Sequence, residues 1–124
     1  MREMIFKDET YTIIVFCMEI HNHLGYGFSE IVYKDALQNE LLENNISYER
    51  EKEFSVHYKG KLLPHKFYAD FIIFDAIIVE LKCVNELLDE HVSQAINYLK
   101  VSGKKLALLI NFKRSKLEYK RIVY

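Results

Sequence analysis

Residues 69–82, with the sequence ADFIIFDAIIVELK, combine two apolar runs that carry three charged residues, Asp70, Glu80 and Lys82, with Asp75 in the segment between the runs. Runs so rich in Ile, Val and Phe are typical of strands inside a sheet, and the short segment FDA between them is typical of a hairpin tip. An unpaired charge in such a strand loses on the order of several kcal/mol of hydration. These charges must therefore compensate one another or share a ligand from outside the chain.

The side-chain alternation of this hairpin predicts that the three charges converge. Glu80 and Lys82 are two residues apart and point to the same face of a strand, and a three-residue tip at 74–76 sets Asp70 opposite Glu80. Facing carboxylates repel each other unless a cation lies between them, and hard oxygen ligands favour Mg²⁺ or Mn²⁺. A salt bridge at a sheet edge is the alternative, because E-x-K is short and recurs at 118–120 without a preceding aspartate.

Length and composition indicate a single domain covering residues 1–124. The chain is 50% hydrophobic and 14% aromatic, and one proline and four glycines leave no candidate linker. The longest apolar run, at 13–18, is too short to cross a bilayer, and the N-terminal residues MREMIFKDET lack a signal-peptide pattern. We therefore expect a cytoplasmic protein without membrane contact. Cys17 and Cys83 have no cysteine or histidine at ligand spacing, which argues against zinc or a disulfide.

Charge is distributed unevenly along the chain, although the formal net charge is only −1. Residues 95–124 hold eight Lys or Arg residues and one acid, a balance of +7, whereas the first 94 residues have a balance of −8. A basic segment of this kind attracts phosphate, although a solvated lysine-rich end that favours solubility is the alternative. The candidates for contacts with a nucleic-acid backbone are Lys104, Lys105, Lys113 and Arg114.

Hydrophobic periodicity predicts the element order helix, helix, three strands, helix, two strands. Glycines that suit a helix end follow the first and third helices at residues 25 and 103. The segment KGK at 59–61 is expected to form a hairpin turn. The helices are expected at about 9–23, 29–44 and 89–102, and the strands at about 48–58, 65–74, 77–83, 105–112 and 117–123.

Two further motifs flank the charged hairpin. GFSEIVY at 27–33 has the form GxxExxY, and HVSQAINY at 91–98 has the form HxxQxxxY on the predicted third helix. Together with ADF and VELK, in this order, they resemble the motifs of the GxxExxY family of the PD-(D/E)XK nuclease-like superfamily. The resemblance extends from about residue 25 to the C-terminus, although Ala69 occupies the position before the aspartate where the superfamily motif has proline.

The resemblance implies a fold and a reaction. The fold is α/β (α+β), a restriction-endonuclease-like core of order α-β-β-β-α-β with a central mixed sheet flanked by helices, which agrees with the predicted elements. The reaction is metal-dependent hydrolysis of the phosphodiester bonds of nucleic acid, in the first instance DNA, with Mg²⁺ or Mn²⁺ as the cofactor. A homodimer would allow so small a domain to cut both strands of a duplex.

The resemblance also implies roles for individual residues. Asp70, Glu80 and the carbonyl group of Leu81 correspond to metal ligands, and Glu30 completes the acidic site directly or through water. Lys82 corresponds to the catalytic lysine, which orients or deprotonates the attacking water. Gln94 corresponds to the polar catalytic residue of the following helix.

Each of the flanking residues also has a simpler interpretation. Glu30 shares a helical stripe with apolar residues, yet it also suits the first turn as an acid favoured by the helix macrodipole. Gln94 could satisfy a backbone group. His91 could form a site wall with Gln94 and Tyr98, but its position at a helix start is more typical of a capping or surface residue. Tyr33 and Tyr98 are expected to be core rings whose hydroxyls lie at the edge of the site.

Two other classes of function remain open at this stage. A non-cleaving nucleic-acid-binding module could use the same fold, although a degraded acidic site would be its usual signature. A protein-interaction module could use the carboxylates to bind a structural metal, in which case no nucleic acid would be cut.

Overall fold

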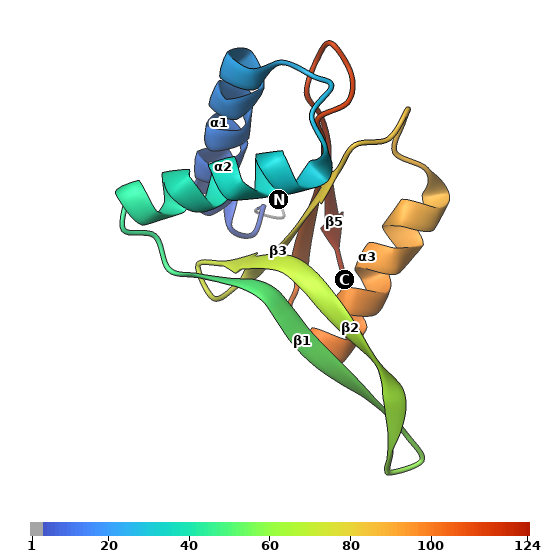
Figure 1. Ribbon diagram of the computed structural model, residues 1–124. Coiled ribbons are helices and arrows are strands. Elements are labelled where there is room, and N and C mark those ends of the chain that lie inside the picture. The colour runs from blue at the N-terminus through green and yellow to red at the C-terminus, as the bar shows by residue number, and fades with distance from the viewer. Residues whose placement is uncertain (1–3) are drawn as a thin grey trace.

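The computed structural model describes residues 4–124 (Figure 1). Residues 1–3, which begin the segment used above to argue against a signal peptide, lie outside the described residues. Among the described residues, no helix is long and apolar enough to span a membrane. The elements are α1 (Lys7–Leu24), α2 (Glu30–Glu43), β1 (Tyr48–Tyr58), β2 (Lys61–Ile73), β3 (Ile77–Lys82), α3 (Asp89–Ser102), β4 (Leu106–Asn111) and β5 (Glu118–Val123).

The five strands form one mixed sheet in the order β1-β2-β3-β4-β5. All neighbouring strands are antiparallel except β3 and β4, which run parallel because α3 connects them as a crossover. The core α2-β1-β2-β3-α3-β4 confirms the predicted element order and the α+β class.

Helices cover both faces of this sheet. Helices α1 and α2 pack on one face and α3 packs on the other (Figure 1). The alternation of β3 follows from this arrangement, since Ile77, Val79 and Leu81 belong to the cluster beneath α1 and α2, whereas Ile78 belongs to the cluster beneath α3. Glu80 and Lys82 continue the series of Ile78, so the strand directs them toward the side of α3.

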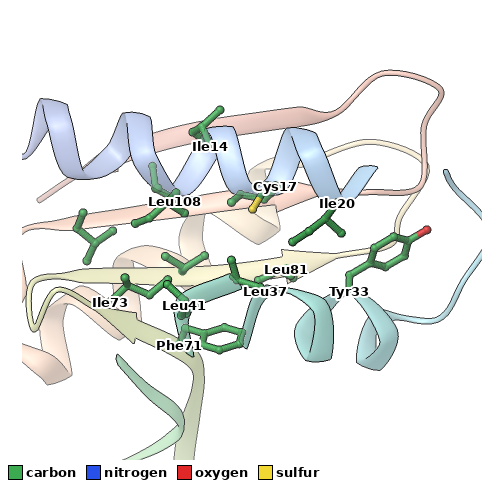
Figure 2. Close-up of a cluster of buried hydrophobic side chains, with 14 of the residues drawn as sticks. Ile14, Cys17, Ile20, Tyr33, Leu37, Leu41, Phe71, Ile73, Leu81 and Leu108 are labelled. Atoms are coloured by element: carbon green, nitrogen blue, oxygen red, sulfur yellow. The ribbon is translucent and has the colours of Figure 1, made fainter. Parts of the chain in front are cut away.

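The cluster beneath α1 and α2 is the larger of the two cores, and Figure 2 shows its side chains between these helices and the strands. The free thiol of Cys17 is fully buried in it, where it acts as a small apolar side chain. Its labelled members are Ile14, Cys17, Ile20, Tyr33, Leu37, Leu41, Phe71, Ile73, Leu81 and Leu108.

The structure corrects the predicted start of β2. The strand begins at Lys61 rather than near residue 65, because Lys59 and Gly60 alone form the turn, with φ angles of 50° and 77°. Pro64 lies inside the strand where the register between β1 and β2 shifts, a bulge that tolerates a missing N–H. The result is a longer hairpin than the sequence predicted.

Candidate active site

The charged hairpin is built by the register of β2 and β3. The two strands pair from Ile73 opposite Ile77 to Phe71 opposite Val79, so a three-residue connection at 74–76 joins them. Continuing this register by one position places Asp70 opposite Glu80. Parity and tip length, both visible in the sequence, are sufficient to produce this arrangement.

At Asp70 and Glu80, side-chain hydrogen bonds link the two strands. The backbone N–H of Asp70 donates to Oε2 of Glu80 at 2.7 Å, and the backbone N–H of Leu81 donates to Oδ2 of Asp70 at 2.9 Å. Each carboxylate therefore fixes the backbone of the opposite strand. This reciprocal pairing holds two acids side by side at a defined geometry, which a flexible surface pair would not do.

Glu80 is the buried member of the pair, with an exposed fraction of 3%. Burial raises the pKa of its carboxyl group, the nearby charge of Asp70 raises it further, and Lys82 lowers it, with a result of about 8. None of the ion pairs formed by residues 4–124 includes Glu80. The ionised form of Glu80 would consequently gain stability from an added cation.

Lys34 is the cation nearest to Asp70, and the sequence analysis did not identify it. Its Nζ atom lies 2.9 Å from Oδ1 of Asp70 and 3.5 Å from Oε1 of Glu51, and its side chain is only 15% exposed. Burial alone lowers the pKa of Lys34, but the hydrogen bond and charge of Asp70, followed by the charges of Glu51 and Glu30, raise it above its ordinary value. The lysine is thus held in its charged form over the acidic pair.

Glu30 interacts electrostatically with Lys34 and not directly with the carboxylates of Asp70 and Glu80. It lies one helical turn before Lys34 on α2. Its charge raises the pKa values of both Lys34 and the Cys83 thiol, after burial in the case of Cys83. The structure places Glu30 at the edge of the site, and no hydrogen bond joins it to Asp70 or Glu80 among the described residues.

Helix α3 supplies the opposite wall of the site. Nζ of Lys82 donates to Oε1 of Gln94 at 3.1 Å. Tyr98 is almost completely buried, and burial, followed by the charges of Glu80 and Asp70, raises the pKa of its phenol. Tyr98 therefore stays protonated beside the acidic pair and contacts Phe67 edge to face at 5.7 Å between ring centroids. Gln94 and Tyr98 lie one turn apart on α3, Tyr98 buried against the sheet and Gln94 exposed at the rim of the site.

Two other candidates have structural partners of their own. Tyr33 is fully buried, its hydroxyl donates to the carbonyl of Gly25 at 2.7 Å, and its ring stacks on Phe112 at 4.4 Å. His91 accepts the backbone N–H of Leu88 at 2.9 Å through Nδ1, so it caps the start of α3. Neither side chain makes a hydrogen bond to the acidic pair among the described residues.

The four basic candidates separate into two groups. Lys104 precedes β4 and donates to the carbonyl of Asp75 at 2.8 Å, at the hairpin tip and therefore at the end of β3 farthest from Lys82. Lys105 follows it at the same end. Lys113 and Arg114 follow the other end of β4, where Asn111 pairs with Lys82. Only Lys113 and Arg114 are thus at the end of the sheet that carries the site.

A network that sequence reasoning did not find fixes the loop after Lys82. Asn111 is fully buried, and its amide accepts the N–H of Val84 at 3.0 Å and donates to the carbonyl of Val84 at 2.8 Å. The same amide donates to Oε1 of Glu118 at 3.0 Å, and that oxygen accepts the N–H of Leu87 at 3.2 Å. Asn111 and Glu118 therefore position the connection between Lys82 and α3.

The donor set of the site fits a divalent cation of the Mg²⁺ type in chemistry and burial. Asp70 and Glu80 provide adjacent carboxylates, each held by a backbone N–H of the opposite strand. No group of three or more His, Cys, Asp and Glu side chains in residues 4–124 is arranged to hold a metal ion. A bound cation would therefore depend on two carboxylates, backbone oxygen and water.

A mixed sheet whose antiparallel hairpin carries an aspartate and a Glu-x-Lys sequence, flanked by helices on both faces, defines a nuclease-like α+β protein. The family profile described as the PD-(D/E)XK nuclease superfamily matches residues 7–122 of the sequence. The chain therefore belongs to the PD-(D/E)XK nuclease superfamily. No curated protein matches the sequence.

Two solved structures share the fold over nearly the whole chain. The crystal structure of SSO0001 superposes with a TM-score of 0.57 and 18% identity and covers 98% of this chain and 78% of that chain. An alkaline exonuclease, LHK-Exo from Laribacter hongkongensis, superposes with a TM-score of 0.55 and 10% identity and covers 98% of this chain and 72% of that chain. At these identities the two likenesses show a common fold.

Proposed function

We propose that the protein is a divalent-metal-dependent nuclease of the GxxExxY type that hydrolyses phosphodiester bonds of DNA. The observation that carries this proposal is the reciprocal pairing of Asp70 and Glu80. The buried carboxylate of Glu80 has no ion-pair partner among residues 4–124, while Lys82 lies two residues away on the same strand. Membership of the nuclease superfamily supports the reaction class, and the alkaline exonuclease supports the suitability of this fold for such a reaction.

The cation is assigned to the acidic pair. Asp70, Glu80 and the carbonyl group of Leu81 would hold Mg²⁺ or Mn²⁺, with Glu30 as a further acid acting directly or through water. When bound, the cation polarises the scissile phosphate and offsets its negative charge. Lys34 forms an ion pair with Oδ1 of Asp70 at 2.9 Å, so a cation would compete with this lysine for the carboxylate.

The proposed role of Lys82 is to act on the attacking water and on the scissile phosphate. An ammonium group has donors and no free lone pair, so it cannot be a metal ligand. Its place beside Glu80 suits it to orient or deprotonate the attacking water and to stabilise the charge of the pentavalent transition state. Gln94 holds the lysine at 3.1 Å, and Tyr98 shields the carboxylates from bulk water.

Tyr33 and His91 have positioning roles in this proposal. The hydroxyl of Tyr33 ties the start of α2 to Gly25, which orients the helix that carries Glu30 and Lys34. The cap formed by His91 fixes the first turn of α3, one turn before Gln94. Lys113 and Arg114 would contact the flanking backbone, while Lys104 and Lys105 lie too far along the sheet for the same phosphates.

One observation favours a second candidate, a non-cleaving nucleic-acid-binding module. The ion pair of Lys34 occupies Oδ1 of Asp70 at 2.9 Å, an oxygen that a cation would otherwise use. If Lys34 balances the acids permanently, the site needs no metal and cuts nothing. A homodimer and a cytoplasmic location remain predictions under either function.

The deciding experiment is incubation with labelled single- and double-stranded DNA and RNA in Mg²⁺, Mn²⁺ and EDTA in parallel. The wild-type protein is expected to cut DNA only with a divalent cation, and Asp70→Asn is expected to abolish cutting. Asp75→Asn is the matched control, because Asp75 is an exposed acid at the tip of the same hairpin. Binding of DNA without cleavage in any metal would support the non-cleaving module instead.

A further inference from the structure

The hairpin of β1 and β2 extends well beyond the rest of the molecule. Residues 56–66, here called the arm, include the turn and the first part of β2, and all of them except Val56 are exposed. Figure 1 shows the arm projecting past α3 and the other strands. Because exposed residues contribute little to a core, the fold does not explain this extension.

The arm differs from the rest of the chain in charge. It contains three lysines and two histidines and no acid, whereas the formal net charge of the whole chain is −1. Lys66 is bonded to Glu53 at 3.3 Å, while Lys59 and Lys61 lie at the turn itself. Neither Lys59 nor Lys61 forms an ion pair within residues 4–124, so the end of the arm presents positive charge to solvent.

The position of the arm relates it to the active site. Strand β2 runs antiparallel to β3, so the residues of β2 that precede Asp70 extend beyond the carboxyl end of β3. The arm therefore leaves the sheet at the end where Glu80 and Lys82 lie. A strand rises about 3.3 Å per residue, so Lys61 lies up to about 30 Å from Asp70 along β2. B-form DNA rises about 3.4 Å per base pair, which makes this reach about nine base pairs.

We propose that the arm is a two-stranded β-ribbon that binds the major groove of duplex DNA on one side of the scissile phosphate. The major groove of B-form DNA is wide enough for such a ribbon, with Lys59 and Lys61 near the phosphates. The exposed apolar side chains of Tyr58 and Leu62, at 60% and 59%, would contact base edges and thymine methyl groups. The major groove of A-form RNA is too narrow to admit the arm, so the inference specifies duplex DNA as the substrate class. It rests on the proposed nuclease function for the position of the cut, but the groove contact itself does not require cutting.

The test compares two double variants with the same charge change. Lys59→Gln/Lys61→Gln removes the charges of the arm, and Lys7→Gln/Lys100→Gln removes two exposed lysines on α1 and α3. Binding to labelled 30-base-pair DNA and RNA duplexes of equal sequence is measured by fluorescence anisotropy in EDTA at several salt concentrations. Cleavage in Mg²⁺ is measured separately, so the failure of catalysis and the failure of the arm are distinguishable.

The arm variant is expected to lose about tenfold in DNA affinity, and the slope of log K against log salt should fall in magnitude by about 2, close to 0.9 for each lost phosphate contact. The control should keep both values within about twofold, and wild-type protein should bind the RNA duplex more weakly than DNA.

Equal losses in the two double variants, or equal affinity for the DNA and RNA duplexes, would overturn the proposal. The same holds if sedimentation shows that the arm variant loses only self-association while it retains DNA affinity, since the arm would then bind a second copy of the chain. Metal-dependent cutting of DNA with unchanged binding would remove the arm proposal and leave the nuclease function. Binding of the arm to the groove without any cutting would remove the nuclease function and leave the arm proposal.

Discussion

The two halves of β2 present the same kinds of residue in opposite environments. From Ala69 to Ile73 the strand lies in the body of the sheet, and its single charge, Asp70, is fixed by a backbone N–H and by Lys34. From Lys61 to Tyr68 every residue is exposed. A charge between Ala69 and Ile73 loses hydration free energy on burial and must be compensated by a partner. A charge between Lys61 and Tyr68 keeps its water and is available to a binding partner.

This contrast separates two kinds of function along one strand. Substitutions at the buried end should change chemistry, metal affinity and stability together, because the groups there are coupled. Substitutions in the arm should change binding alone. The predictions below are ordered from the largest expected effect to the smallest, and each one tests whether the two halves are as distinct as their environments indicate.

Lys82 gives the largest expected effect among the substitutions that leave the cation bound. Lys82→Met keeps most of the side-chain volume and removes the ammonium group, so cleavage should fall by about 10²- to 10⁴-fold while the divalent cation still binds. Cleavage is followed with labelled DNA, metal binding by calorimetry and folding by thermal melts. Lys100→Met, an exposed lysine on α3, is the control. A folded Lys82→Met protein that cuts at the wild-type rate would exclude the catalytic role.

Asp70 gives the largest expected effect on metal affinity. Asp70→Asn removes one charged hard ligand and leaves Lys34 without its closest acid, so calorimetry should detect a loss of Mg²⁺ or Mn²⁺ affinity of at least about tenfold. Asp75→Asn should bind the cation as wild type does, because Asp75 lies at the hairpin tip and pairs with Lys104. Equal metal affinity in wild type and Asp70→Asn would place the cation elsewhere.

The raised pKa of Glu80 predicts how the stability of the folded protein depends on pH. Burial followed by the charge of Asp70 raises the pKa of Glu80 from 4.5 to about 8, so between these values the folded state binds a proton that the unfolded state has released. Stability should therefore fall as pH rises through this window, by about 1.4 kcal/mol per pH unit at most. Above pH 8 this contribution should level off.

Urea melts at pH 5.5, 6.5 and 7.5 without divalent metal test this dependence. Glu80→Gln should remove the decline, whereas Glu90→Gln on the exposed side of α3 should retain it. Added Mg²⁺ should oppose the decline, because a cation stabilises the ionised carboxylate. A wild-type protein whose stability does not change across this window would contradict the burial assigned to Glu80.

Lys34 tests whether the acidic pair already has a counter-ion that a metal must displace. Lys34→Met should raise Mg²⁺ affinity by about fivefold, near 1 kcal/mol, because Oδ1 of Asp70 becomes free of its ion pair at 2.9 Å. The same substitution should lower stability without metal, since Asp70 loses its compensation. Lys7→Met, an exposed lysine at the start of α1, is the control. A loss of metal affinity in Lys34→Met would show instead that this lysine orients Asp70 for the cation.

The charged hairpin could be predicted from the sequence because its signals are local. The period of two along β3 and the three-residue tip determine that Asp70 faces Glu80, and both can be counted in the sequence. The element order could also be predicted, because apolar periodicity separates helices from strands throughout the chain. The start of β2 could not be predicted in the same way, because the two-residue turn at Lys59 and Gly60 and the bulge at Pro64 depend on the pairing with β1.

The parts of the site that the sequence did not predict all depend on contacts between elements that are distant in the chain. Lys34 reaches Asp70 from α2, and Asn111 reaches Val84 and Glu118 from the end of β4. The sequence E-x-K at 118–120 repeats the motif without its aspartate, yet Glu118 supports the loop after Lys82. The pairing of Lys104 with Asp75 likewise follows from the parallel register of β3 and β4, which no local pattern reveals.

The smallest expected effect is on the stability of the arm. In Lys59→Gln/Lys61→Gln both lysines lie at an exposed turn, and none of the ion pairs of residues 4–124 includes either of them. The free energy of unfolding should therefore change by less than about 0.5 kcal/mol, as for other exposed charges. Urea melts of this variant and of Lys7→Gln/Lys100→Gln measure the difference. Destabilisation by more than about 1 kcal/mol would mean that the arm supports the fold, and the contrast between the two halves of β2 would then fail at its exposed end.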